Sequence, residues 1–307
     1  MSERLQNMST RNQVLLGIGT LVLLGIILGA LFGSEGRNNE FQPQNEFKLT
    51  PWIELKLGAL DMSITKAVLY VFLAAALTTI TMLYIAKRMQ QKPNDVQTAV
   101  EAGYDLTFNQ ITRNNMNPQM ALKWFPFLAT LFFFIWFSNL IGYIPLPTNT
   151  EHTVHVFGLE LPAFAIYAAT ANLSIPLILA TIVWLSYHAE GVHDKGVFGY
   201  LKSWIPSGVT GFARVPIFAI EVISHFVRLI SLSVRLFANL LAGHLLILFM
   251  AGGLVVILGI AALGVFTLPV AVLFFMFEVV LIATPQAFIF TTLTAIYLGE
   301  ATAAEGH

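Results

Sequence analysis

A row of polar side chains lies along one face of a long apolar stretch, residues 215–262. On a helix with about 100° per residue, six of them fall within about 40° of one line. They are Glu221, Ser224, Arg228, Ser231, Arg235 and Asn239. A polar row on a membrane helix faces a water-filled path or a polar group of a neighbour. The carboxyl, guanidinium, hydroxyl and amide groups of this row suit the transfer of protons or the binding of a small anion.

Arg235 stands out in this row because no charged residue follows it until Glu278. It is therefore predicted to lie within the membrane, where an isolated arginine at a helix centre costs roughly 2.5–3.5 kcal/mol. No acidic residue lies within one helical turn of it, so its counter-charge must come from elsewhere in the chain or from another subunit. For Glu221 and Arg228 a simpler interpretation is open, a salt bridge that only holds the helices together.

A second set of polar groups consists of His244, Glu278 and Gln286. His244 lies about 180° from Arg235 on the same helix and must face a different neighbour. Buried carboxyl and imidazole groups can both titrate near neutral pH, so His244 and Glu278 suit a proton relay. The alternatives are a hydrogen-bonded core histidine and, for Gln286, a hydrogen bond that joins two helices.

The composition places these residues in a membrane. The chain has 307 residues, of which 56% are hydrophobic and 11% charged, and its mean hydropathy is +0.74. Soluble domains carry about 25% charged residues. The formal net charge of −1 offers no basic surface for nucleic acid, and without cysteine there are no disulfides or thiolate sites. No Walker A, HExxH or GxSxG motif occurs, so no cofactor and no metal is predicted.

Uncharged runs of about 20 residues predict the membrane spans. The predicted spans are 12–34, 67–86, 124–144 and 163–187, followed by the two long stretches 215–262 and 268–299. The sequence therefore predicts an all-α membrane protein with about six membrane helices. The last two stretches are expected to form a long, tilted helix hairpin. Pro176 is expected to kink the fourth span.

The flanks of these spans predict domains and orientation. Residues 1–34 are interpreted as a retained membrane anchor, because the apolar core is long for a cleaved signal. Residues 35–307 are interpreted as one helical membrane domain. Within it, 95–109 is a candidate amphipathic helix and 188–212 a loop. The stretch 215–262 would be about 70 Å long as one helix, so it must tilt or bend, with Gly252–Gly253 as the candidate bend. Lys and Arg placement predicts a cytoplasmic N-terminus and C-terminus.

Four segments resemble one known family. SLSVRLFANLLAGH, with Arg235-Leu236-Phe237-Ala238-Asn239 and Ala242-Gly243-His244, resembles the signature of subunit a of the F-type ATP synthase. Three more similar segments are FSNLIGYIP at 137–145, TANLSIPLILA at 170–180 and TPQAFIFTTLTAIYLGEA at 284–301. The matches keep the family's order and extend over about residues 65–302. Together they are specific, although each alone is weak.

The resemblance implies a proton-translocating stator subunit of the Fo sector, which is not an enzyme on its own. In such a subunit two aqueous half-channels carry protons to and from a rotating carboxylate. Arg235 matches the essential arginine opposite that carboxylate, and Glu221 matches an acid of the outer half-channel. Asn239 and Gln286 match polar neighbours of the path. His244 and Glu278 resemble an acid–histidine pair that occurs in either order.

The resemblance also implies partners and a location. The partners are the c-subunit ring, the b-subunit peripheral stalk, other ATP synthase subunits and membrane lipid, and the hairpin 215–262/268–299 is expected to face the c-ring. The location is expected to be a bacterial plasma membrane. One departure is that Glu278 precedes Gln286 by eight residues where seven are expected, which a π-bulge near Pro285 would absorb.

Two other functions compete with this one. A secondary transporter would use Arg235 to bind a small anion, although no internal repeat supports it. A structural membrane subunit without any conduction would leave Arg235 and Glu278 without a purpose.

Overall fold

The computed structural model of the chain describes most of the helical part of the sequence. The described residues are 51–57, 60–61, 63–88, 95–143, 153–156, 159–162, 168–206, 208–250 and 264–303, with isolated positions at 19, 20, 23, 27 and 49. Within these residues, five helical segments are long and apolar enough to cross a membrane. Apart from isolated positions, the predicted span 12–34 lies outside the described residues, as does the predicted bend at Gly252–Gly253.

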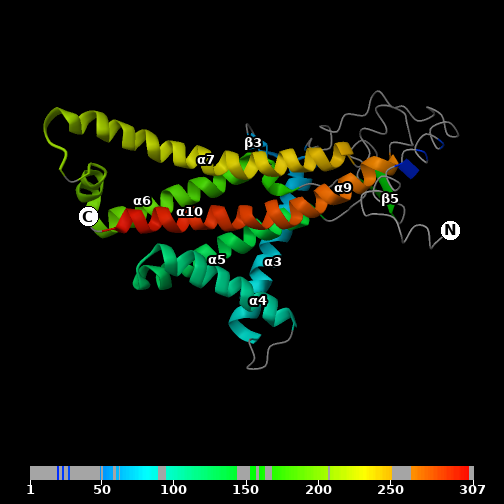
Figure 1. Cartoon of the computed structure of the whole chain (residues 1–307), viewed down its shortest axis with the longest axis horizontal. Coiled ribbons are helices and arrows are strands. Elements are labelled where there is room, and N and C mark those ends of the chain that lie inside the picture. Colours follow the sequence, from blue (N-terminus) through cyan, green and yellow to red (C-terminus); the bar gives the residue numbers. More distant parts are fainter. Residues whose placement is uncertain are drawn as a thin grey trace.

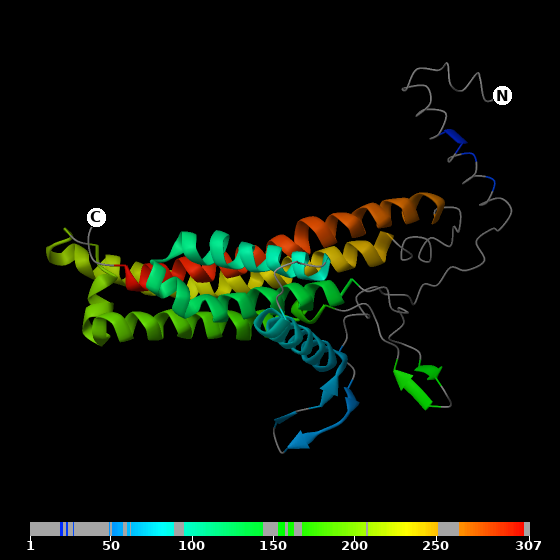
Figure 2. The same ribbon diagram turned by 90° about the horizontal axis from the view of Figure 1, so that it is seen from below.

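The membrane helices form one elongated bundle. They are α3 (Lys66–Arg88), α5 (Pro118–Ile141), α6 (Ser174–Ser203), α7 (Arg214–Leu248), α9 (Gly264–Glu278) and α10 (Thr284–Thr302). The π-helical turn η7 (Val279–Ala283) joins α9 to α10, and these three run side by side with α7 (Figure 1). α10 packs against α5 and α6, and α3 crosses α5 obliquely (Figure 2). The all-α membrane fold is therefore confirmed. The two arms of the predicted hairpin pack against each other, while the turn between them lies outside the described residues.

Shorter elements connect the helices. α4 (Asp95–Asp105) continues into the π-helical segment η2 (Leu106–Arg113), so the predicted amphipathic helix exists and is longer than expected. η3 (Ala169–Ala171) and η4 (Gly211–Ala213) are single 3₁₀ turns before α6 and α7. Within the described residues, three two-stranded antiparallel sheets pair β1 (Pro51–Ile53) with β4 (Ile64–Thr65), β2 (Lys56–Leu57) with β3 (Leu60–Asp61), and β5 (Thr153–Val156) with β6 (Leu159–Pro162).

α5 begins earlier than its apolar run. The side chain of Asn117 accepts a hydrogen bond of 2.9 Å from the backbone N–H of Met120, and Pro118 occupies the first helical position. Asparagine at the cap and proline next to it are preferred helix starts. The asparagine side chain accepts a hydrogen bond from an otherwise unpaired N–H of the first turn, and proline has no N–H to leave unpaired. The predicted start at residue 124 marked the hydrocarbon boundary and missed this cap.

α6 differs most from the prediction. The helix continues through the segment 188–203, which was predicted to be a loop, and Pro176 lies in its first turn, where it causes no kink. The chain bends instead at Gly196, whose φ of 71° favours glycine. The bend brings the ring of Tyr200 back against Gly191, where any side chain would overlap it. Polar residues end an apolar run, but they do not end a helix.

The π-turn between Glu278 and Pro285 is where the sequence predicted an inserted residue. Five residues, Val279–Ala283, have π-helical geometry. Such a turn absorbs one extra residue without breaking the helix. Asn139 of α5 donates a hydrogen bond of 3.0 Å to the carbonyl of Ala283 and accepts one of 2.8 Å from Thr170. The FSNLIGYIP segment therefore stabilises the turn that sets the position of Glu278.

Candidate functional site

The polar row on α7 is confirmed as a continuous feature of one helix, but its members have different surroundings. Ser231, Arg235 and Asn239 are exposed. A neighbouring face of the same turns, about 100° from Arg235, contributes Leu232, Leu236 and Leu240 to the hydrophobic core. Burial of these leucines fixes the rotation of α7, so Arg235 has to point away from the bundle.

Arg235 forms no ion pair or hydrogen bond within the described part of the chain. The acids on its helix and on α10 have other partners, given below. An arginine within a membrane helix is costly without a counter-charge, and the described residues place no carboxylate within ion-pair distance of Arg235. That its partner lies on another element or another subunit stays a prediction.

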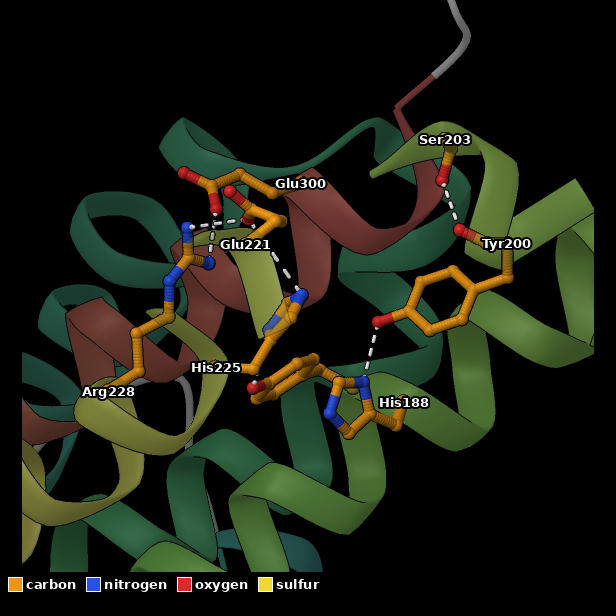
Figure 3. Close-up of polar contacts among 8 residues, drawn as sticks. His188, Tyr200, Ser203, Glu221, His225, Arg228 and Glu300 are labelled. Carbon is orange, nitrogen blue, oxygen red and sulfur yellow. Dashed lines mark hydrogen bonds and ion pairs between the residues drawn. The ribbon is translucent and has the colours of Figure 1, made fainter. Parts of the chain in front are cut away.

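The N-terminal half of the row forms the first polar cluster, which joins α7 to α10 (Figure 3). The guanidinium of Arg228 donates to Glu300 at 2.7 Å and lies 3.9 Å from a carboxylate oxygen of Glu221. Its central carbon lies 4.9 Å from the ring centre of Tyr297, at a cation–π distance. The predicted Glu221–Arg228 bridge is therefore the weaker of two, and the stronger one uses Glu300.

Two histidines extend this cluster to α6. Nδ1 of His225 and the hydroxyl of Tyr187 are hydrogen-bonded at 3.0 Å, and Nδ1 of His188 and the hydroxyl of Tyr200 at 2.6 Å. The other ring nitrogen of His225 is buried without a hydrogen bond and faces Glu221 at 3.8 Å. Figure 3 shows these groups converging from α6, α7 and α10.

A cavity of ≈ 340 Å³ opens beside this cluster. Polar residues that line it include Tyr200, Ser203, Glu221, His225, Arg228 and Glu300. A volume of this size holds several waters, each occupying about 30 Å³ of liquid volume. The cavity therefore offers water access to Glu221 at the end of the bundle where α6 and α10 end.

The second polar cluster lies near the other end of α7. The hydroxyl of Tyr143, just beyond the C-terminus of α5, donates to the carboxylate of Glu278 at 3.0 Å. The carboxylate packs directly on Gly243, where any added side chain would overlap it.

His244 completes the second cluster. It is 1% exposed, and its ring lies 4.6 Å from the ring of Tyr143 between centroids. Its Nδ1 lies 2.9 Å from the carbonyl of Leu240 and its Nε2 lies 3.1 Å from the carbonyl of Gly142. Because a neutral imidazole has a single N–H, only the protonated ring can donate to both carbonyls. In the described structure Tyr143, rather than a direct bond, connects His244 with Glu278.

The residues predicted from the sequence thus occupy three levels along α7. Glu221 lies about 21 Å from Arg235 along the helix axis, and His244 lies about 14 Å beyond Arg235. Gln286 is buried in α10, whereas Asn239 is exposed next to Arg235. Glu221 lies at the end of the bundle where α10 ends, because it lines the same cavity as Ala303. The two expectations of an outer Glu221 and a cytoplasmic C-terminus therefore exclude each other.

Several groups in the two clusters were not identified from the sequence. They are Tyr143, Tyr187, His188, Tyr200, His225, Tyr297 and Glu300. His225 follows Glu221 by four residues, so helical spacing alone was a usable signal. The other six are brought in by α5, α6 and α10, and only the packing of these helices shows their proximity.

Comparisons with known proteins agree with this architecture. Residues 68–299 match the model of the family described as ATP synthase A chain. An ATP synthase subunit a from Hyphomonas neptunium is 33% identical over 272 residues, covering 86% of this chain and 97% of the relative. Subunits a from Paramagnetospirillum magneticum and Brucella ovis are 32% and 30% identical over 84% of this chain, with 97% and 96% of their own lengths covered. The chain therefore belongs to the ATP synthase A chain family and is a membrane subunit of the Fo sector, not a catalytic subunit.

Proposed function

We propose that the chain conducts protons by two separate polar paths that both end at the Arg235 face of α7. Its role in proton translocation follows from the family. The observation that supports two paths is the separation of the polar clusters, one around Glu221 and one around Glu278, with exposed Arg235 between them. Proton flow through these paths would drive rotation of a c-subunit ring and thereby ATP synthesis.

Arg235 has an electrostatic role in this proposal. The missing counter-charge would be a carboxylate of the c-subunit ring that passes along the exposed face of α7. A fixed cation favours the ionised form of a nearby carboxyl group, so the ring releases its proton there. The same cation repels a proton that would pass directly from one path to the other. Exposed Asn239, one turn further along, is placed to contact the same ring.

The two paths have different chemical groups. One leads through the water-accessible cavity to Glu221. The other uses Glu278 and His244, which Tyr143 connects, with Gln286 about two turns beyond Glu278 on the same continuous helix. With the C-terminus on the cytoplasmic side of a bacterial plasma membrane, Glu221 belongs to the cytoplasmic path and Glu278 to the outer one. The b-subunit stalk and the other subunits would hold the chain against the ring.

A reconstitution tests this function against anion transport. Vesicles that contain the c-ring and b-subunits should show proton uptake driven by a potassium diffusion potential only when this chain is also present. Vesicles with the chain alone should take up neither protons nor small anions such as chloride or phosphate. Anion uptake by the chain alone, with no gain in proton uptake in the complete set, would favour the transporter.

Replacing Tyr143 with phenylalanine tests the role of the hydrogen bond between Tyr143 and Glu278. Loss of the single buried hydrogen bond should slow ATP-driven proton pumping by about two- to thirteenfold, the factor that 0.5–1.5 kcal/mol represents. The ring stays in place, so assembly of the complex should be unchanged. Tyr84→Phe on α3 is the matched control, since Tyr84 lies outside both clusters. Pumping at the unaltered rate in Tyr143→Phe would remove Tyr143 from the path.

A further inference from the structure

We infer that Glu300 is a positioning residue, which holds Arg228 away from Glu221 so that the Glu221 carboxylate stays free to exchange protons. This role rests on the proposed proton conduction and adds a residue of α10 that the polar row on α7 does not contain. Glu300 is hydrogen-bonded to Arg228, so we expect its effect to pass through this guanidinium.

The geometry divides Arg228 unequally between two carboxylates. Its contact with Glu300 is a hydrogen-bonded ion pair of 2.7 Å, whereas the 3.9 Å separation from Glu221 is beyond hydrogen-bonding distance. The ring of Tyr297, three residues before Glu300 on α10, supports the same guanidinium at 4.9 Å. Tyr297 and Glu300 together therefore draw the arginine toward α10.

Glu221 consequently has no hydrogen-bond partner among the charged side chains around it. Its two nearest ones are Arg228 at 3.9 Å and Nε2 of His225 at 3.8 Å. Its side chain is 33% exposed, and it lines the cavity of ≈ 340 Å³. A carboxylate held in a short arginine pair strongly favours the ionised form, so it does not readily accept a proton. The looser contact leaves Glu221 able to exchange protons with water in the cavity.

Without the negative charge of Glu300, the nearest remaining carboxylate for Arg228 is Glu221. A small rotation of the guanidinium would turn the 3.9 Å contact into a short ion pair. Proton transfer through Glu221 would then slow, although Glu221 itself is unchanged. If this is the mechanism, removing the charge of Arg228 as well has to restore the rate.

The experiment compares Glu300→Gln, Arg228→Gln and the double variant. ATP-driven proton pumping is measured in membrane vesicles that contain the complete ATP synthase, and each rate is divided by the amount of assembled chain. Glu300→Gln should pump at least about fivefold more slowly, because a freed guanidinium binds Glu221. Arg228→Gln should lose about twofold or less, and the double variant should match Arg228→Gln. Glu190→Gln, which breaks the 2.6 Å pair with Lys123 between α5 and α6, is the matched control and should lose less than Glu300→Gln.

Four results would overturn this role of Glu300. They are normal pumping in Glu300→Gln, a double variant as slow as Glu300→Gln or slower, equal slowing in Glu190→Gln, and loss of assembled chain in Glu300→Gln. The last would make Glu300 a purely structural residue. Arg235→Ala in the same vesicles separates this inference from the proposed function. If Arg235→Ala pumps normally, the proposed function fails. If Arg235→Ala is inactive and the double variant does not regain the rate of Arg228→Gln, only the role of Glu300 is refuted.

Discussion

Replacing Arg235 with alanine is expected to lower ATP-driven proton pumping by about 100-fold or more, a loss typical of removing a pre-placed electrostatic group. The side chain lies on the exposed face of α7 and contributes nothing to the core formed by Leu232, Leu236 and Leu240. The variant should therefore assemble normally. What it loses is the cation that favours the ionised form of a carboxyl group on the ring.

Passive proton conduction should respond differently from pumping. Without the cation, protons can pass between the two paths without a full rotation of the ring. Vesicles with Arg235→Ala should therefore remain permeable to protons under a diffusion potential while they fail to pump. Arg214→Ala is the control, because it removes another arginine of the same helix. Arg214 lies at the exposed N-terminal end of α7 and donates to the carbonyl of Val209. Its replacement should leave the pumping rate within about twofold of the unaltered rate. Coupled pumping by Arg235→Ala at the unaltered rate would refute the gating role.

Much of the fold could be predicted because the membrane imposes simple rules on the sequence. A helix that crosses the hydrocarbon needs about 20 apolar residues, so α3, the start of α7 and the end of α10 were found close to their observed positions. The same rule placed the start of α5 too late and ended α6 too early. Asn117 caps α5 outside the apolar run, and Glu190 is accommodated in α6 because Lys123 of α5 neutralises it.

The site was predictable where one helix carries it. Spacing along α7 was enough to align Glu221, Arg228 and Arg235. The π-turn was predicted because the family resemblance leads one to expect seven residues between Glu278 and Gln286 where this chain has eight. The partners on other helices were not predictable. Glu300 meets Arg228 across 72 residues of sequence, and Tyr143 meets Glu278 across 135. Neither contact leaves a periodic pattern, because each joins two helices whose rotation is set by core packing.

The two clusters therefore differ in how their carboxylates are held. Glu221 has no short hydrogen bond to another side chain in the described structure and lines a cavity. Glu278 is 2% exposed, accepts a hydrogen bond from Tyr143 and lies on Gly243. A carboxylate in such a fitted site has little room to move. Its function consequently depends on the shape of the neighbouring backbone as much as on its own chemistry.

Gly243→Val should accordingly reduce ATP-driven pumping by about tenfold or more, because it forces Glu278 away from Tyr143 and leaves buried polar groups without partners. A Cβ at residue 243 would overlap the carboxylate of Glu278. The neighbouring His244 ring lies within hydrogen-bonding distance of the carbonyls of Leu240 and Gly142, so it cannot easily move aside. Gly243→Ala should show the same effect at a smaller size.

Ala76→Val is the control for the glycine variants, because residue 76 is exposed on α3, which carries none of the groups of the two clusters. It should pump at close to the unaltered rate. Assembled chain is quantified in each membrane preparation. Gly243→Val should also lower passive proton conduction, since protons need the path by Glu278 whether or not the ring rotates. Conduction at the unaltered rate in Gly243→Val would mean that protons do not pass by Glu278, and the outer path would then have to be sought among other groups.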